Sequence, residues 1–303
     1  MRSVRWRLLL IALLPLMVLL PLLLGITMQR WISRFDDLLI AKVASDLRVA
    51  EQYFGRIEAT QAATVAAVAQ SVGFADALNT GEANIQSFLD QRRADIGLDF
   101  LIWVAMSDAT LPQPLREIAE ASEVDTPVGH VALMDKADIE RVAPKLIPLA
   151  TLPLVQTEAA RSIDRDLETR GMFILAAQRN ASGDRALIGG RLLNRNLDFI
   201  DTMNALVYRD ETGEISRIGT TTLFLDDVRI STNVRLFEGA RALGTRVSEA
   251  VWQKVMERGD TWLDRAFVVN NWYISGYVPL TDITGDRIGM LYTGFLATPF
   301  TAQ

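Results

Sequence analysis

The hydrophobic pattern begins with an uncharged run over residues 8–26, LLLIALLPLMVLLPLLLGI. About 20 apolar residues are enough to cross a bilayer as a helix, and proline is tolerated in such helices. A cleaved signal peptide usually has a shorter apolar region of about 7–15 residues, followed by a small-x-small cleavage site. The run here is longer and its end, Gly25-Ile26-Thr27, is a poor cleavage site. We therefore predict a transmembrane helix over residues 8–27.

Three arginines precede this run and give its orientation. Positively charged residues stay on the cytoplasmic side of a membrane. The residues before the run include three arginines and no acid, namely Arg2, Arg5 and Arg7. We predict that residues 1–7 are a cytoplasmic tail and that residues 28–303 lie outside the bacterial inner membrane, which this chain crosses once.

A second periodic segment follows directly, over residues 28–75. Apolar side chains recur there at steps of three or four residues, as on one face of a helix; they include Phe35, Leu39, Val43, Leu47, Phe54 and Val68. The pattern predicts a long stalk helix with an alanine-rich middle over 59–69. Its apolar face could pack on its own domain or form the seam of a parallel homodimer, and both could hold along different lengths.

The next block, residues 76–195, reads as mixed helix and strand. We expect helices over 84–93 and 135–146, a turn-rich stretch over 112–128, and strands over 100–106, 171–178 and 185–193. The last two strands flank Asn180-Ala181-Ser182-Gly183-Asp184, which is rich in turn-forming residues. These elements predict a helix-interrupted antiparallel sheet.

The last block, residues 196–300, repeats this order. It predicts helices over 197–208 and 248–258, and strands over 220–225, 228–234, 262–269, 272–280 and 287–296. The pairs Asp226-Asp227 and Asn270-Asn271 are typical of two-residue hairpin turns, and the second would set Val268 opposite Tyr273. The fold class is thus α/β (α+β), with two PAS-like antiparallel-sheet modules in tandem: a membrane-distal one and a membrane-proximal one.

Alternation along the strands of the second block selects residues that could face a ligand. Arg229, Ser231 and Asn233 should share one face, and Tyr273 should share a face with Tyr277. A guanidinium in a partly closed cleft suits a carboxylate, which it can hold with two parallel hydrogen bonds. Alternatively, Arg229 only ties neighbouring strands to acidic residues at the surface.

The first block offers a second set of ligand-facing candidates. Trp103 lies on an apolar strand and could form a pocket wall or part of the core. Three arginines at or near the later strands could serve an anionic ligand: Arg170, Arg179 and Arg191.

Composition excludes several functions. The chain has 31 basic and 37 acidic residues, and five of the basic residues and none of the acidic ones lie before residue 35. The part from residue 35 onward therefore has 26 basic and 37 acidic residues, a formal charge of −11. An acidic surface disfavours nucleic acid. There is no cysteine, and His130 is the single histidine, so thiol chemistry and a multi-histidine metal site are excluded. We predict no enzymatic activity, no catalytic residue, no metal site and no cofactor for this chain, and a surface or hydrogen-bonded role for His130.

The chain resembles the double Cache extracytoplasmic sensor domains of bacterial transmembrane sensor histidine kinases. The stretches that carry the resemblance are GTTTLFLDDVRISTNVRL (219–236), RALGTRVS (241–248), DRAFVVNNWYISGYVPLTD (264–282) and RIGMLYTGFLATPF (287–300). The resemblance implies a PAS-like sheet that binds a small molecule, first of all in the membrane-distal block. Members of this family that bind amino acids use an arginine followed closely by Trp-Tyr. This pattern is not evident in the membrane-distal block.

The resemblance also implies a second membrane helix, of which residues 301–303 would be the start, and a cytoplasmic output module that would act on a response regulator. The same input domain occurs in chemoreceptors and cyclic-dinucleotide enzymes. From another class, a membrane-anchored periplasmic interaction protein without signalling output is the alternative, and an anchored hydrolase is third.

Overall fold

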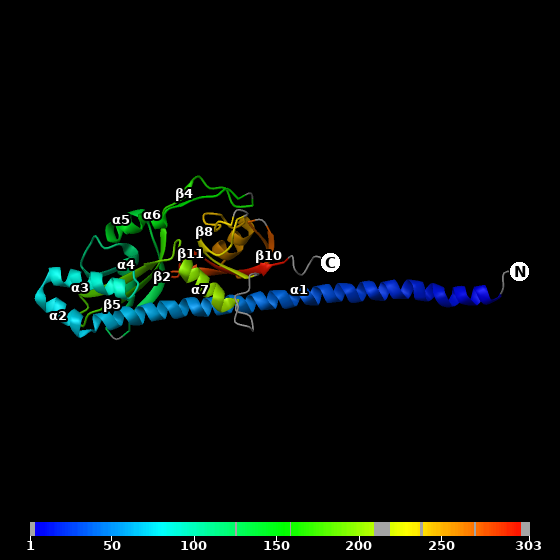
Figure 1. Ribbon diagram of the computed structural model, residues 1–303, viewed down its shortest axis with the longest axis horizontal. Helices are drawn as coiled ribbons and strands as arrows, with labels where there is room; N and C mark the ends of the chain where they lie inside the picture. The colour runs from blue at the N-terminus through cyan, green and yellow to red at the C-terminus, as the bar shows by residue number, and fades with distance from the viewer. Residues whose placement is uncertain are drawn as a thin grey trace. The chain divides into compact units, whose positions relative to one another are not determined.

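The computed structural model describes residues 4–124, 126–157, 159–208, 219–236, 239–269 and 271–297 (Figure 1). Within the first helix, the side chains of residues 4–12, 14–16, 18, 31–33 and 35 lie outside this description. The predicted second membrane segment, from residue 301, also lies outside it. The chain divides into two compact units, Met1–Lys42 and Val43–Gln303, and each is considered by itself.

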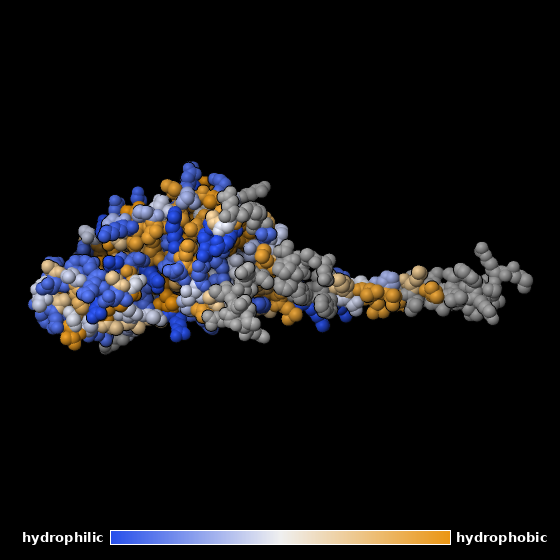
Figure 2. All heavy atoms as spheres, in the orientation of Figure 1, coloured by the Kyte–Doolittle hydropathy of each residue, from blue (hydrophilic) through white to orange (hydrophobic). Residues whose placement is uncertain are grey.

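The first unit is helical throughout its described backbone, which belongs to α1 (Val4–Ala69). The predicted membrane segment over 8–27 falls in this helix, and nine of its side chains are among those not described. The described ones include exposed apolar residues (Figure 2), among them Leu19, Leu20, Leu22, Leu23, Leu24 and Ile26. Among the residues that the structure describes, no helix is both long enough and apolar enough to span a membrane.

The predicted end of the stalk helix near residue 75 is wrong. The helix α1 ends at Ala69, and a separate helix, α2 (Val72–Thr80), begins two residues later. The Ser71 hydroxyl caps α2 by accepting a hydrogen bond from the Phe74 amide at 3.2 Å. It also donates to the Val68 carbonyl at 2.7 Å. This one side chain therefore satisfies backbone groups at the end of one helix and the start of the next.

The first sheet has four antiparallel strands in the order β1-β6-β5-β2. The elements of this half of the second unit are α3 (Glu82–Asp95), β1 (Phe100–Ala105), α4 (Gln113–Ala121), β2 (Val128–Met134), α5 (Lys136–Val142), η1 (Pro144–Leu146), α6 (Ile147–Ala150), β3 (Leu152–Pro153), β4 (Leu167–Glu168), β5 (Gly171–Arg179) and β6 (Arg185–Leu192). The strands predicted over 100–106, 171–178 and 185–193 are present as β1, β5 and β6.

The helix α4 occupies the stretch that we expected to be turn-rich, over 112–128. Pro112 and Pro114 suggested turns, but Pro112 is the residue before the helix and Pro114 lies in its first turn, where proline is tolerated. Leu115, Ile118 and Ala119 are buried at the spacing of one helix face. The next strand, β2, was missing from the prediction; it pairs with β5 and carries His130.

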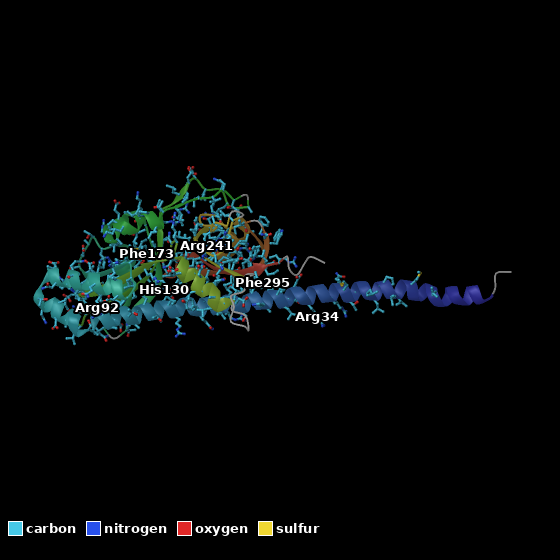
Figure 3. All side chains as sticks on the ribbon, viewed as in Figure 1. Arg34, Arg92, His130, Phe173, Arg241 and Phe295 are labelled. Atoms are coloured by element: carbon cyan, nitrogen blue, oxygen red, sulfur yellow. The ribbon has the colours of Figure 1, made fainter. Side chains whose placement is uncertain are left out.

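The second sheet has five antiparallel strands in the order β8-β7-β11-β10-β9. Its elements are α7 (Leu197–Val207), β7 (Gly219–Leu225), β8 (Val228–Thr232), α8 (Glu249–Trp252), η2 (Gln253–Glu257), β9 (Trp262–Val268), β10 (Asn271–Thr281) and β11 (Arg287–Leu296). All five strands and both helical segments predicted for this block are present. Phe173 lies with the first sheet, and Arg241 and Phe295 with the second (Figure 3).

Of the two predicted hairpin turns, one is confirmed and one is displaced. Leu225 pairs with Val228, so Asp226 and Asp227 form the first turn. In the second hairpin Asn271 is already paired with Val268 and Tyr273 with Ala266, so the predicted Val268–Tyr273 register is wrong by two residues. Because side chains alternate with a period of two, this shift leaves the predicted faces unchanged.

The apolar face of α1 packs on its own chain within the second unit. Leu47, Ala50 and Phe54 share a core with α7 and residues from both sheets, and Val65 and Val68 pack with α2 and the first sheet. Of the two alternatives for this face, packing on its own domain is therefore confirmed for residues 47–68.

Candidate ligand-binding site

A buried arginine on β8 is the centre of the candidate site. Arg229 follows the tight turn at Asp226-Asp227, and a bulge in the β7–β8 pairing sets it opposite Phe224. Its side chain is only 3% exposed, and its guanidinium carbon lies 5.0 Å from the centroid of the Phe224 ring. One guanidinium nitrogen donates to Thr245 Oγ1 at 2.6 Å. The Nε atom is buried and has no hydrogen-bond acceptor among the described residues.

This arginine has no carboxylate partner among the residues that the structure describes. An arginine stays protonated in proteins, although burial lowers the pKa of Arg229. A buried charge without a counter-ion is costly. The site therefore favours an anion, which would supply the missing acceptors.

Tyrosine side chains of β10 and β11, which lie beyond β7 in the sheet, come near the guanidinium. Tyr277 and Tyr292 are fully buried, with ring centroids 4.7 Å apart, and Phe224 packs against both. Burial raises the pKa of the Tyr292 hydroxyl to about 12 and that of Tyr277 still further. Burial also raises the pKa of Tyr273, which Arg229 opposes. At neutral pH these three phenols are uncharged, so they do not compensate the arginine.

A cavity of about 450 Å³ opens beside Arg229, which is within the range of small-molecule sites. Its wall is mainly apolar and is completed by Arg229, Tyr277 and a few polar groups. The lining residues are Val155, Gln156, Thr157, Ala159, Arg229, Leu236, Thr245, Arg246, Val247, Ser248, Phe267, Val268, Val269 and Tyr277. The cavity thus combines two buried arginines, of which Arg246 is paired with Asp227 and Arg229 is not paired with a carboxylate among the described residues, with a mainly apolar enclosure.

Three of the residues predicted for the second block come together here, and one does not. Arg229 and Tyr277 line the cavity, and Tyr273 belongs to the same core cluster as Tyr277. Asn233 instead accepts a hydrogen bond from the Thr221 amide at 2.8 Å. The predicted shared face of Arg229 and Ser231 is also wrong, because Ser231 donates to the Asn196 carbonyl at the start of α7. The bulge in the β7–β8 pairing breaks the alternation between them.

The four candidates from the first block do not converge on one site. Trp103 packs edge-on against Phe74 at 5.2 Å, and Arg179 donates to the Ser122 carbonyl at 2.6 Å. Burial raises the pKa of Tyr53, and the charge of Arg191 opposes this rise. The inner face of the first sheet is filled by apolar residues of β5, β6, α4 and α5.

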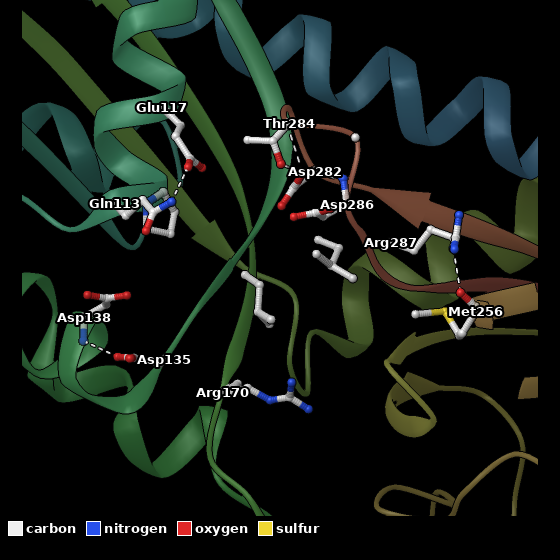
Figure 4. A pocket seen from close by; sticks show the side chains of 14 residues that line it. Gln113, Glu117, Asp135, Asp138, Arg170, Met256, Asp282, Thr284, Asp286 and Arg287 are labelled. Atoms are coloured by element: carbon white, nitrogen blue, oxygen red, sulfur yellow. Dashed lines mark hydrogen bonds between the residues drawn. The ribbon is translucent and has the colours of Figure 1, made fainter. Parts of the chain in front are cut away.

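Arg170 lies at a larger cavity of about 850 Å³, which α4 and the start of α5 line on one side and residues 282–288 on the other (Figure 4). Arg170 is engaged by Glu168, with two contacts of 2.8 Å. Asp282 accepts hydrogen bonds within its own turn, and Arg287 donates to the Met256 carbonyl. The described residues contain no group of three or more acidic or histidine side chains placed to hold a metal ion. Arg170, Asp282 and Arg287 therefore make structural contacts within the protein at this cavity.

His130 has a structural partner on α1. Its Nδ1 lies 3.3 Å from Glu58 Oε1, and Glu58 also accepts a hydrogen bond from the Val131 amide at 2.7 Å. The interaction with Glu58 raises the pKa of His130 against the effect of burial. The histidine lies on β2 (Figure 3) and does not line the Arg229 cavity.

Sequence reasoning missed the residues that reach the site from outside the sheet. Thr245, Arg246 and Val247 come from an irregular segment before α8, and Val155 and Thr157 follow β3. None of these segments carries the periodicity that identifies an element. One local signal was Gly244, whose φ of +77° belongs to a region that favours glycine; it lies in the stretch 241–248, which carries part of the family resemblance.

Comparison with known proteins gives one family match over part of the chain and several solved structures of low similarity. Residues 191–303 match the family model Single cache domain 3, and this stretch includes Arg229, Thr245 and Tyr277. No curated protein matches the chain. Among solved structures, the periplasmic domain of Vibrio cholerae LuxQ is similar, with 11% identity, 84% of this chain and 99% of that chain covered, and a TM-score of 0.45. The ligand-binding domain of the Pseudomonas aeruginosa PAO1 chemoreceptor PctB, in complex with L-Arg, has 11% identity, coverage of 89% and 99%, and a TM-score of 0.40.

Proposed function

We propose that this chain is the extracytoplasmic ligand-sensing region of a bacterial membrane receptor. In this proposal residues 8–27 anchor it in the inner membrane, residues 28–303 lie outside, and the two sheets are tandem Cache-like modules. The receptor class implied by the sequence resemblance is a two-component sensor histidine kinase, with its output module on the cytoplasmic side. The Cache family match over 191–303 supports the sensor class.

The observation that carries the proposal is the buried, uncompensated Arg229 in a mainly apolar cavity. A small carboxylate would accept two parallel hydrogen bonds from the guanidinium, and its apolar part would lie against Val247, Val268 and neighbouring side chains. We therefore assign the ligand to the class of small organic anions. The membrane-proximal module becomes the first choice of site, in place of the distal one.

Binding can act on the receptor through β11, the strand that carries Tyr292 next to the site. Tyr292 lies on β11, which ends at Leu296, and β11 pairs with both β7 and β10. A ligand shifts such an arrangement only if it binds two conformations with different affinity. A coupling free energy of about 1–3 kcal/mol is typical of such effects.

The test is binding of aliphatic and aromatic monocarboxylates to the full chain, measured by calorimetry, with the corresponding amides as uncharged controls. Hydrogen bonds to a charged group contribute about 1.5–3 kcal/mol, so Arg229→Met should weaken binding by at least about tenfold. The matched control is Arg235→Met, at an exposed arginine beyond the same strand, which should bind normally. Equal binding by both variants, or equal affinity for the acids and their amides, would refute the assignment.

A further inference from the structure

One wall of the Arg229 cavity comes from a distant part of the chain. The crossing segment, defined here as residues 152–157 and 159–161, leaves the first-sheet half after α6 and reaches the second sheet. Four of its residues line the cavity: Val155, Gln156, Thr157 and Ala159. Figure 1 shows the green part of the chain around β4 extending over the yellow elements of the second-sheet half. Without this segment the cavity would be open on that side.

Among the described residues, two backbone hydrogen bonds hold the crossing segment against the second-sheet half, together with one from the Arg246 amide to the Thr157 hydroxyl at 3.3 Å. The Val155 amide donates to the Gly244 carbonyl at 2.9 Å, and the Glu249 amide donates to the Ala159 carbonyl at 2.8 Å. The approach at Gly244 is close, because a Cβ added there would lie 2.1 Å from the Pro153 carbonyl oxygen. Apart from the two residues of β3, these are contacts of irregular chain, and they can separate without dismantling either large sheet.

The strongest attachment is electrostatic and lies at Arg161. Its Nη2 contacts Asp226 Oδ2 at 2.5 Å and its Nε contacts Asp227 Oδ2 at 3.2 Å. Its guanidinium carbon also lies 4.1 Å from the centroid of the Trp252 ring, and the Trp252 indole donates to Asp226 Oδ1 at 2.6 Å. Asp226 and Asp227 form the turn that immediately precedes Val228 and Arg229. The contacts of Arg161 with these two aspartates, the anchor of the segment, are therefore next to the ligand site.

The two aspartates do not depend on Arg161 alone. Asp227 is fully buried and also accepts hydrogen bonds from Arg246, a residue that lines the cavity. Asp226 keeps its bond from Trp252 when Arg161 moves away. Release of Arg161 therefore leaves neither carboxylate without a partner, which lowers the cost of opening compared with breaking an isolated buried pair.

We infer that the crossing segment is a latch that closes the Arg229 cavity and that the contacts of Arg161 with Asp226 and Asp227 hold it shut. Ligand entry and release then require the latch to open. Because the latch is covalently continuous with α6 and β5, cavity occupancy in the second sheet acts directly on the first-sheet half. The ligand role of the cavity rests on the proposed function, whereas the opening of the latch is a property of the fold alone.

The chain has no cysteine, so a single introduced thiol reports on this opening. Val268 lines the cavity and is 2% exposed. In Val268→Cys, measured on the full chain without any ligand, a small thiol reagent should react slowly. Adding Arg161→Gln removes two ion pairs and a cation–π contact that attach the latch to the second-sheet half. The reaction should therefore become about tenfold faster or more.

Control variants distinguish opening of the latch from a general loss of stability of the fold. Arg241→Gln removes a comparable paired arginine, held by Asp201 at 2.7 and 2.6 Å, that does not line the cavity; it should leave the Val268→Cys rate unchanged. Asp226→Asn breaks the same anchor from the other side and should accelerate the reaction like Arg161→Gln. Ala177→Cys, buried in the first-sheet core, should stay unreactive in both backgrounds.

The inference is overturned if Arg161→Gln and Arg241→Gln give the same rate, or if Val268→Cys reacts no faster than Ala177→Cys when the anchor is removed. Failure of carboxylate binding would refute the proposed ligand but not the latch. An unchanged thiol rate would refute the latch but not the ligand.

Discussion

At the scale of single residues, two buried arginines that line the candidate site differ in what surrounds them. Arg246 is 8% exposed and is paired with the buried Asp227. Arg229 is 3% exposed and has a threonine hydroxyl, tyrosines and an aromatic ring around it. The first arginine has the environment of a structural ion pair. The second has an environment that costs stability until an anion is bound.

This difference predicts opposite effects of the same substitution. Replacing a whole buried ion pair by apolar side chains of similar volume is often neutral or stabilising by about 1–4 kcal/mol, whereas removing one partner of a buried pair costs about 3–5 kcal/mol. An unpaired buried arginine has no partner charge to leave behind, so its replacement resembles the first case. In the absence of ligand we expect Arg229→Met to raise the free energy of unfolding by roughly 1–2 kcal/mol. Arg246→Met should lower it by about 3 kcal/mol or more. Denaturant unfolding monitored by circular dichroism measures both, and a loss of stability in both variants would contradict this reading of Arg229.

At the scale of elements, α1 lies against both sheets at positions where the strands carry glycine. A Cβ added at Gly129 of β2 would lie 2.3 Å from the Glu58 carbonyl oxygen, and one at Gly276 of β10 would lie 2.9 Å from Val43 Cγ1. Gly189 of β6 faces Val65 in the same way, at 2.9 Å. Glycine in a strand interior often marks such a close approach, and here it lets the helix reach the sheet surface.

The close approach can be tested with two glycine substitutions of opposite expected sign. Gly129→Ala forces a methyl group against backbone, and overpacking costs about 1–3 kcal/mol. Gly55 lies on α1 with no atom within 4 Å of an added Cβ, so Gly55→Ala should stabilise the protein by about 0.5–1 kcal/mol through helix propensity. Thermal unfolding of the two variants beside the unchanged chain gives the comparison. If Gly129→Ala were neutral, α1 would not lie on β2 as described.

At the scale of the whole molecule, the homodimer stays a prediction, and the fold restricts where its seam can lie. The apolar face of α1 over 47–68 is already buried on its own chain. The opposite face is exposed and carries small or polar side chains, with Val49 41% exposed. A parallel dimer through the second-unit part of this helix would therefore use the face that includes Val49, Gln52, Ala59 and Ala63.

Cysteine crosslinking in membranes tests this placement. Val49→Cys and Ala59→Cys, both at exposed positions, should form disulfide-linked dimers with a common oxidant. Ala50→Cys, which is fully buried, should not. Residues 49 and 50 are neighbours on the same helix and differ in solvent exposure, so each position is a control for the other. Crosslinking at residue 50 but not at 49 or 59, or none at any position, would exclude the proposed seam.

The sequence by itself determined the elements whose signals are local. The long periodic face predicted α1, and alternation and turn residues predicted the five strands of the second sheet, because these patterns depend on neighbours within a few residues. Alternation also identified Arg229, Tyr273 and Tyr277 as candidates. The strand pairing was off by two residues at the second hairpin, since Asn270-Asn271 looked like a complete turn while the pairing begins at Asn271.

Only the tertiary structure decided what surrounds those candidates. A bulge placed Arg229 and Ser231 on different faces, and no local pattern announces an inserted residue in a ladder. Trp103, Arg179 and Arg191 share a sheet but point to separate partners, which sequence spacing cannot reveal. The cavity wall from Val155 to Ala159 and the anchor at Arg161 join segments far apart in the chain, with Arg161 and Asp227 separated by 66 positions. Such contacts form through packing and charge pairing between irregular segments, which have no periodicity to predict them.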